Sequence, residues 1–271
     1  MENKLGVIGF GNIARSIITP LLDSGFVEPE DIFCIVKSEK SLNNIKNNYK
    51  YKIKIFLADS EEAKIIWNCP VKILAIKPQH LGQINEININ KASANKTMVS
   101  ILAGVSINTL KKKFPNHNCA RVVTNVPILI SEGLTAIAFD QEIKNYERKF
   151  ICKVFENSSK IYQLEESYLD IFLAITSSGP AIIALIVEAL SDGGLLGGLQ
   201  KNLSEELVMD MIVGTIMLMK KKKINTNELK NMVSSPGGTT IAALRTLEEK
   251  SCRSALIESV IAASNRSKEF S

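Results

Sequence analysis

The pattern of apolar and polar residues changes near residue 165 of this 271-residue chain. Before that point, short runs of consecutive apolar residues alternate with longer mixed segments, as in strands of a sheet that is covered on both faces. The runs predict strands at residues 5–8, 32–36, 53–57, 71–76, 98–101, 120–124 and 135–139, and the mixed segments predict helices at residues 12–24, 38–47, 61–68 and 107–113. This alternation predicts a doubly wound parallel sheet with right-handed crossovers.

After residue 165 the pattern is helical throughout. Helices are predicted at residues 167–175, 180–190, 204–219, 227–232, 239–248 and 252–268. Segments 181–187 and 208–219 have no wide polar face, and a helix that is apolar all round is normally buried. Because so small a domain offers little core of its own, we expect a second subunit to cover them. The predicted fold class is α/β, with a doubly wound domain at residues 1–164 and an all-helical dimerisation domain at residues 165–271.

The composition is that of a globular protein and disfavours several classes. Hydrophobic residues make up 45% and charged residues 23% of the chain, near the averages for globular domains. The five cysteines lie far apart without a C-x-x-C pair, and there are only two histidines. We therefore expect neither a disulfide scaffold nor a metal site.

Charge and hydropathy predict no nucleic-acid or membrane partner. The net charge of +5 is a small excess, and the run Lys220–Lys223 follows an apolar helix, where cations offset the helix dipole. Interleaved aromatic residues, which single-stranded nucleic acids require for stacking, do not accompany it. A strand-like run begins within the first five residues, unlike a secretory signal. The longest uncharged apolar stretch, residues 171–187, is shorter than the ~20 residues of a spanning helix. We expect a cytoplasmic protein.

A G-x-G-x-x-A motif lies between the first predicted strand and the first predicted helix, in the segment GVIGFGNIA of residues 6–14. In this context Gly9 permits a tight turn, Gly11 lets the backbone approach a pyrophosphate, and Ala14 permits close packing of helix and strand. The helix N-terminus adds N–H donors and the positive end of a dipole. The motif therefore predicts a Rossmann-type, dinucleotide-binding domain.

The end of the second predicted strand bears on the choice of dinucleotide. NAD-binding domains place an acidic residue there, which accepts a hydrogen bond from the ribose 2′-hydroxyl. Here the strand ends in Lys37 and Ser38, and the first acid is Glu39. A lysine and a hydroxyl suit a 2′-phosphate, so NADP(H) is favoured, with NAD(H) and an ordinary polar loop as the alternatives.

Two further strand ends face the same edge of the predicted sheet. One strand stops at Lys77 and Pro78, and another stops in the small residues Ala103 and Gly104. Ligands of open α/β sheets bind at the carboxyl ends of strands. Lys77 is therefore placed to meet a cofactor, and the small residues leave room for a flat ring. Taken singly, each is more often a plain loop.

Two hydroxyl-rich breaks precede helices in the second half of the chain. They are SSPGGTT at residues 234–240 and TSSGP at residues 176–180. Exposed N–H groups, hydroxyls and the helix dipole at such positions form an anion site. The alternative is an ordinary capped helix start, which explains the second break better than the first, whose paired glycines and threonines exceed what capping needs.

Taken in order, these motifs resemble the pyrroline-5-carboxylate reductase family of the 6-phosphogluconate dehydrogenase-like superfamily. The resemblance runs from Leu5 to Glu269 and includes one further motif, RVVTNVP at residues 121–127. Its most specific part is the SPGGTT segment, followed by AAxxRS in the last helix. It implies an NAD(P)-binding domain, a helical domain interlocked with that of a partner subunit, and NAD(P)H-dependent reduction of a cyclic imine.

The resemblance also implies roles for particular residues. Gly9, Phe10, Gly11, Asn12 and Ile13 resemble the pyrophosphate loop, Lys37 and Ser38 the 2′-phosphate site, and Ala75, Ile76, Lys77, Pro78 and Ala103 the nicotinamide side. Ser235, Gly237, Gly238, Thr239 and Thr240 resemble the loop that binds the substrate carboxylate, and Glu166 an acid near the substrate. Ser60 stands where relatives often have an asparagine on the adenine side, and Leu173 where they have a threonine. No catalytic residue is assigned.

The implied chemistry suits this composition, because a protonated imine is already electrophilic and needs no strong general acid. A carboxylate held by residues 235–240 would place the imine carbon against the nicotinamide, so that proximity supplies most of the rate. Two alternatives remain. A hydroxyacid dehydrogenase on the same plan would need a catalytic lysine in the helical domain, but no lysine occurs between Lys160 and Lys201. A non-catalytic NADP-binding protein would not need the substrate loop.

Overall fold

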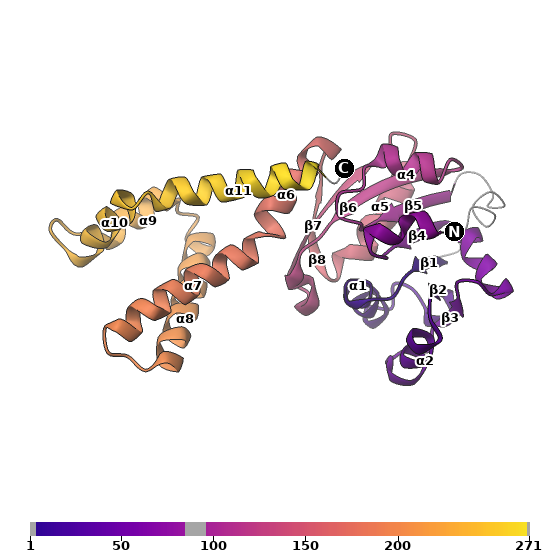
Figure 1. Ribbon diagram of the computed structural model, residues 1–271, viewed down its shortest axis with the longest axis horizontal. Coiled ribbons are helices and arrows are strands. Elements are labelled where there is room, and N and C mark those ends of the chain that lie inside the picture. The colour runs from indigo at the N-terminus through magenta and orange to yellow at the C-terminus, as the bar shows by residue number, and fades with distance from the viewer. Residues whose placement is uncertain (1–3, 85–95, 270–271) are drawn as a thin grey trace. The chain divides into compact units, whose positions relative to one another are not determined.

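Eight strands form one sheet in the computed structural model, which describes residues 4–84 and 96–269 (Figure 1). Their order across the sheet is β3-β2-β1-β4-β5-β6-β7-β8. The strands are β1 (Leu5–Ile8), β2 (Ile32–Val36), β3 (Lys54–Leu57), β4 (Val71–Leu74), β5 (Lys96–Ser100), β6 (His117–Val123), β7 (Gly133–Phe139) and β8 (Ser159–Gln163). The first six follow the order 3-2-1-4-5-6 of dinucleotide-binding sheets, which confirms the predicted fold class.

Helices cover both faces of this sheet, and each face has its own core. Alternate side chains of one strand enter opposite cores: Cys34 of β2 packs with α1 and α5, whereas Phe33 packs with η2 and α4. Every residue of β1, β2 and β4 is buried, which explains the continuous apolar runs of β1 and β2; β4 differs in containing the buried Lys72. The helices of this part are α1 (Asn12–Asp23), α2 (Glu39–Asn48), α4 (Ile107–Lys113), α5 (Asn145–Glu156), α6 (Leu169–Thr176) and the 3₁₀ helices η1 (Pro29–Asp31), η2 (Glu61–Asn68), η3 (Pro78–Gln83), η4 (Val126–Ile130) and η5 (Glu166–Tyr168).

The sheet departs from the prediction at its far edge. β7 runs antiparallel to β6, with Arg121 opposite Ala138, and β8 then pairs parallel with β7. The segment between β6 and β7 holds only the short η4. A parallel crossover needs a dozen or more residues, so the chain turns back instead. β8 and α5 were not predicted, because β8 is half polar and pairs only along one edge.

The chain forms two compact units, and they divide at other points than the predicted boundary between residues 164 and 165. One unit runs to Ser177 and takes up the chain again from Ala263, and the other is Ser178–Ala262. α6 stays with the sheet because Leu169, which is fully buried, packs against Val123 and Ala136. As an assignment of functional domains, the boundary at residue 165 stays a prediction.

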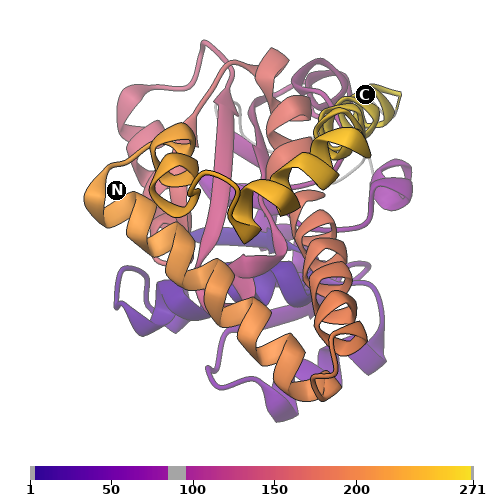
Figure 2. The same ribbon diagram turned by 90° about the vertical axis from the view of Figure 1, so that its left-hand side faces the viewer.

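The second unit is entirely helical. Its elements are α7 (Gly179–Leu196), α8 (Lys201–Lys222), α9 (Thr226–Val233), α10 (Thr239–Glu249) and the greater part of α11 (Cys252–Lys268). α7 and α8 contact each other and form a hairpin whose two helices diverge from the connecting turn (Figure 2). In it the buried Ser204 donates a hydrogen bond to the Ser191 carbonyl, 2.8 Å away.

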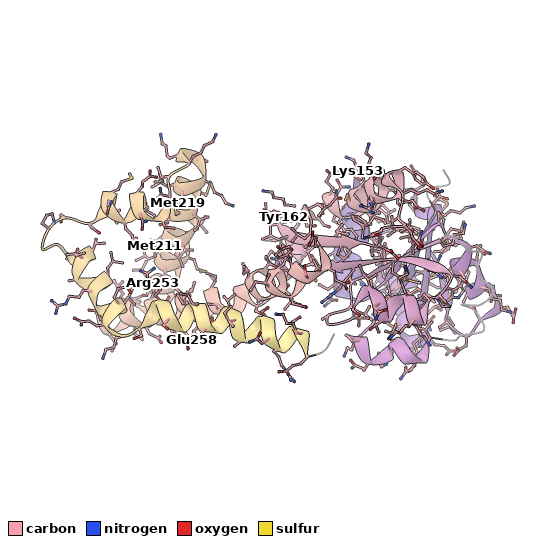
Figure 3. The ribbon with its side chains drawn as sticks, turned by 90° about the horizontal axis from the view of Figure 1, so that it is seen from above. Lys153, Tyr162, Met211, Met219, Arg253 and Glu258 are labelled. Atoms are coloured by element: carbon pink, nitrogen blue, oxygen red, sulfur yellow. The ribbon has the colours of Figure 1, made fainter. Side chains whose placement is uncertain are left out.

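Large apolar side chains of this unit are exposed. On α8, Met211 is 50% exposed (Figure 3) and Val213 is 57% exposed, and on α7 Leu185 is 65% exposed. Among the described residues, one helical stretch, Glu166–Leu196, is long and apolar enough to cross a membrane by length and composition. It comprises α6 and α7, which are separate helices. A monomer rarely leaves so much contiguous apolar surface in water.

Candidate active site

The turn between β1 and α1 has the geometry of a dinucleotide-binding turn. Gly9 has φ +90°, and a Cβ there would lie 2.7 Å from the Ala75 carbonyl oxygen, so only glycine fits. Its N–H donates to the Ile35 carbonyl at 2.9 Å. Gly11 is the N-cap of α1, no side chain caps this end, and the first turn holds no acid. The first N–H groups of α1 are therefore available to an anion.

One depression joins this turn to the ends of β4, β5 and β6. It brings together seven of the predicted residues, namely Gly11, Asn12, Ile13, Ala75, Ile76, Lys77 and Ala103. It is mostly apolar, which suits a flat ring. It also includes Ala14 of the glycine motif, Leu173, and Ser177 of the TSSGP segment. The lining residues that were not predicted as site residues are Ile101, Val122, Val123 and Thr124. Thr124 follows β6, so the carboxyl end of that strand was the available signal.

A second depression lies on the other side of the turn, at the ends of β1, β2 and β3. Of the predicted residues it contains Gly9, Lys37 and Ile76. The remaining lining residues were not predicted as site residues: Ile8, Ile35, Val36, Ala58, Asp59, Trp67, His80, Gln83 and Ile84. The adenosine half of a dinucleotide is recognised at the end of the second strand, so this is the candidate adenosine side.

Four of the predicted cofactor-binding residues lie outside the lining of both depressions. Ser38 and Ser60 cap helices: their Oγ atoms accept from Ser41 N at 3.2 Å and from Ala63 N at 3.3 Å. Phe10 is 6% exposed and stacks edge-on against Tyr49, while Pro78 begins η3. Each therefore has a local structural role, and its cofactor contact stays a prediction.

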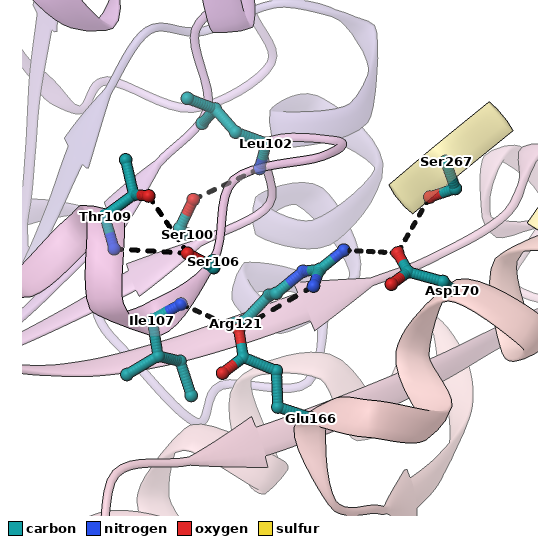
Figure 4. A network of polar contacts seen from close by, with 9 residues as sticks. All are labelled: Ser100, Leu102, Ser106, Ile107, Thr109, Arg121, Glu166, Asp170 and Ser267. Carbon is teal, nitrogen blue, oxygen red and sulfur yellow. Dashed lines mark hydrogen bonds and ion pairs between the residues drawn. The ribbon is translucent and has the colours of Figure 1, made fainter. Parts of the chain in front are cut away.

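Glu166 takes part in a buried polar network (Figure 4). Its Oε1 accepts from the Ile107 N–H at 2.7 Å and lies 3.7 Å from Arg121 Nη1. Arg121 is 2% exposed and donates through Nη2 to Asp170 Oδ1 at 2.9 Å. The Ser267 hydroxyl donates to the same oxygen at 2.8 Å. The network ties α4, β6, α6 and the end of α11 together, so Glu166 has a structural role whatever else it contacts.

The SPGGTT segment forms the start of α10, within the helical unit. Gly237 has φ +67°, and the Gly238 N–H donates to the Ser235 carbonyl at 3.0 Å. Gly238 is the N-cap of α10, which has no side-chain cap and no acid in its first turn. Thr239 and Thr240 begin the helix, so their N–H groups lie at its positive end. This local geometry is that of an anion site.

Reactive side chains are scarce in the described part of the chain. Burial raises the pKa of the Cys69 thiol to about 11 and that of Cys119 to about 12, so neither is a thiolate nucleophile at neutral pH. The described residues include no group of three His, Cys, Asp or Glu side chains that could hold a metal ion.

Comparison with known proteins decides the family. The pyrroline-5-carboxylate reductase of Synechocystis sp. is 34% identical over 271 residues, which covers 100% of this chain and 99% of the relative. This chain belongs to the pyrroline-5-carboxylate reductase family. Residues 166–270 match the family model for pyrroline-5-carboxylate reductase dimerisation, and residues 4–104 match that of the coenzyme F420-dependent NADP oxidoreductases.

Solved structures agree with this membership of the reductase family. The Plasmodium falciparum pyrroline carboxylate reductase with NADP bound is 27% identical, with a TM-score of 0.84 over 100% of this chain and 99% of that chain. The reductase of Coxiella burnetii is 26% identical, with a TM-score of 0.88 over the same shares. The predicted resemblance is confirmed. The dimerisation match also explains the exposed apolar side chains of α7 and α8.

Proposed function

We propose that this chain reduces 1-pyrroline-5-carboxylate to L-proline with NADPH, the last step of proline biosynthesis, in the cytoplasm. The observation that carries the proposal is family membership along the whole chain, together with a glycine turn and uncapped helix at the candidate cofactor site. The active form is a homo-oligomer of at least two chains, in which α7 and α8 of a partner cover the exposed apolar surface.

The domain assignment follows from the same reasoning. Residues 1–164 constitute the NAD(P)-binding domain, and residues 165–271 constitute the substrate-binding and dimerisation domain. The dimerisation match at residues 166–270 supports this boundary. The compact units do not coincide with these two proposed domains, because α6 packs on the sheet although it belongs to residues 165–271.

The cofactor site fits NADP(H), with NAD(H) as the weaker alternative. The first N–H groups of α1 would bind the pyrophosphate, Lys37 and Ser38 the 2′-phosphate, and Ser60 the adenine side. Ala75, Ile76, Lys77, Pro78 and Ala103 would hold the nicotinamide, which supplies a hydride when bound.

The loop at the start of α10 would bind the substrate through its carboxylate. The N–H groups of Gly238, Thr239 and Thr240, with the hydroxyls of Ser235 and the two threonines, offer donors to an anion at an uncapped helix end. Anchoring the carboxylate orients the imine carbon for hydride transfer, so that most of the catalysis is positioning. Glu166 would stabilise positive charge on the ring nitrogen.

The test measures NADPH-dependent reduction of pyrroline-5-carboxylate by the loss of near-ultraviolet NADPH absorbance. Thr240→Ala removes one hydroxyl donor to a charged group, which costs about 1.5–3 kcal/mol, so KM for the imine should rise about 10- to 100-fold. KM for NADPH should stay within about twofold of wild type.

Thr246→Ala is the matched control, because its hydroxyl donates to the Ala242 carbonyl further along the same helix. It should leave both KM values unchanged. Equal effects of Thr240→Ala on imine and NADPH would contradict the role of the loop. Turnover of a hydroxyacid without reduction of the imine would contradict the proposed function itself.

A further inference from the structure

Three polar side chains meet at the rim of the candidate adenosine depression. Lys37 Nζ, just after β2, donates to Gln83 Oε1 at 3.0 Å. His80 Nδ1 lies 3.1 Å from the same oxygen. His80 and Gln83 both belong to η3, which follows β4. The contact therefore joins segments 46 residues apart across the mouth of one depression.

The same depression also contains an acidic side chain. Asp59, which follows β3, lines it together with Lys37. A lysine paired with a carboxylate has its charge largely neutralised, whereas one that donates to a neutral amide keeps its full charge for a ligand. A lysine ammonium also sits on a flexible four-carbon stem, and fixing it costs rotamer entropy. A lysine that binds a phosphate should therefore be both fully charged and already oriented. Gln83 provides both conditions, because its neutral amide orients the Lys37 ammonium before the ligand binds and does not neutralise the charge of that ammonium.

We infer that Gln83 is a specificity-determining residue, which selects a 2′-phosphorylated adenosine cofactor over the unphosphorylated one by orienting Lys37. His80 holds the Gln83 amide in place by donating to the same oxygen. The inference rests on the proposed function for the identity of the cofactor. The sequence motifs place recognition of the 2′-phosphate at the end of β2. The inference adds a positioning residue for that recognition on η3, which follows β4.

The test uses the full-length protein and two small probes of the adenosine half, adenosine 2′,5′-bisphosphate and 5′-AMP, with affinities measured by calorimetry. Trp67 is the only tryptophan in the chain and lines the depression, so its fluorescence provides a second readout. Lys37 and Gln83 are both exposed, so their substitution should leave the fold intact, which circular dichroism checks.

The glutamine variants should separate the two probes. Gln83→Ala should weaken the bisphosphate about 5- to 10-fold, because Lys37 then loses its rotamer freedom only when the ligand binds, and should leave AMP within about twofold. Gln83→Glu places a carboxylate against Lys37 and should weaken the bisphosphate more than about 20-fold, again sparing AMP. Gln79→Ala, on the same 3₁₀ helix but not in the depression lining, should change neither affinity.

A double-mutant cycle tests the route of the effect. If Gln83 acts through Lys37, the variant with both Lys37→Met and Gln83→Ala should bind the bisphosphate no more weakly than Lys37→Met alone. Additive losses would overturn the inference, as would an unchanged bisphosphate affinity in Gln83→Ala or equal weakening of both probes. None of these assays uses the imine. Failure of imine reduction with probe selectivity intact would therefore remove the proposed function and leave the selectivity of this site standing.

Discussion

Lys72 lies within β4 with its side chain fully buried, and its protonation should control stability near neutral pH. Nζ donates to the carbonyls of Cys69 at 2.7 Å and Trp67 at 3.3 Å, at the end of η2. Burial lowers the pKa of Lys72 from 10.5 to about 7, with a smaller opposing effect of Cys69 and a smaller lowering effect of Lys96. The folded protein therefore holds this lysine half-neutral at pH 7, while the unfolded chain holds it charged.

The sign follows from proton binding in the two states. Between about pH 7 and pH 10.5 the unfolded chain binds more protons than the folded one at this site, so the free energy of unfolding rises with pH. At about 1.4 kcal/mol per pKa unit, the gain between pH 7 and pH 9 is about 2 kcal/mol. Burial also lowers the pKa of the neighbouring His117, to about 4, and raises that of Cys69, to about 11, so neither dominates in this window.

Lys72→Met removes the ionisable group and keeps an unbranched chain of similar length. The variant should lose the rise of about 2 kcal/mol between pH 7 and pH 9. At pH 7 it should be more stable than wild type by about 2 kcal/mol, since relief of desolvation exceeds the loss of two hydrogen bonds. Urea unfolding at pH 7, 8 and 9 measures both effects, with the exposed Lys52 as the control in Lys52→Met. An unchanged pH dependence in Lys72→Met would refute the reasoning.

Two further predictions concern the network around Arg121 and the turn at Gly9. Among the described residues, Asp170→Ala leaves the buried Arg121 with Glu166, 3.7 Å away, as its one acidic partner. The substitution should cost about 3 kcal/mol in urea unfolding, whereas Arg121→Met combined with Asp170→Leu should cost less than that single change. A larger loss in the double variant would contradict the network. Gly9→Ala combines a positive φ with a clash against the Ala75 carbonyl and should abolish NADPH binding measured by calorimetry. Gly25→Ala shares the positive φ without any atom within 4 Å and should cost only about 1 kcal/mol of stability, leaving binding intact.

The strands of the sheet and the helices around it could be predicted where the pattern of apolar residues in the segment itself indicates them. Continuous apolar runs located β1 and β2 at their observed bounds, because both strands are covered on both faces. β8 escaped prediction because its side chains are only partly buried. The direction of β7 also escaped, since it depends on the length of a connection rather than on the composition of the strand.

The candidate site divides in the same way. The glycines of the turn and the paired residues of SPGGTT were predicted as site residues because of the backbone conformations they permit, which are visible in the sequence. Asp59, His80 and Gln83 are visible only in the structure, because nothing in their own neighbourhoods marks them. The structural role of Ser38 and Ser60 was not predicted. Their hydroxyls, which the sequence predicted to contact a cofactor, cap helices in the structure.

The sequence by itself determined the fold class, the two-part organisation, the dinucleotide turn and the family, because each depends on residues close together in the chain or on motifs kept in order. Only the tertiary structure decided which polar and charged side chains contact each other. Lys37 and Gln83 are 46 residues apart, Arg121 and Asp170 are 49 apart, and Asp170 and Ser267 are 97 apart. Such contacts arise from how the elements pack, and no local pattern specifies the partner of a long polar side chain.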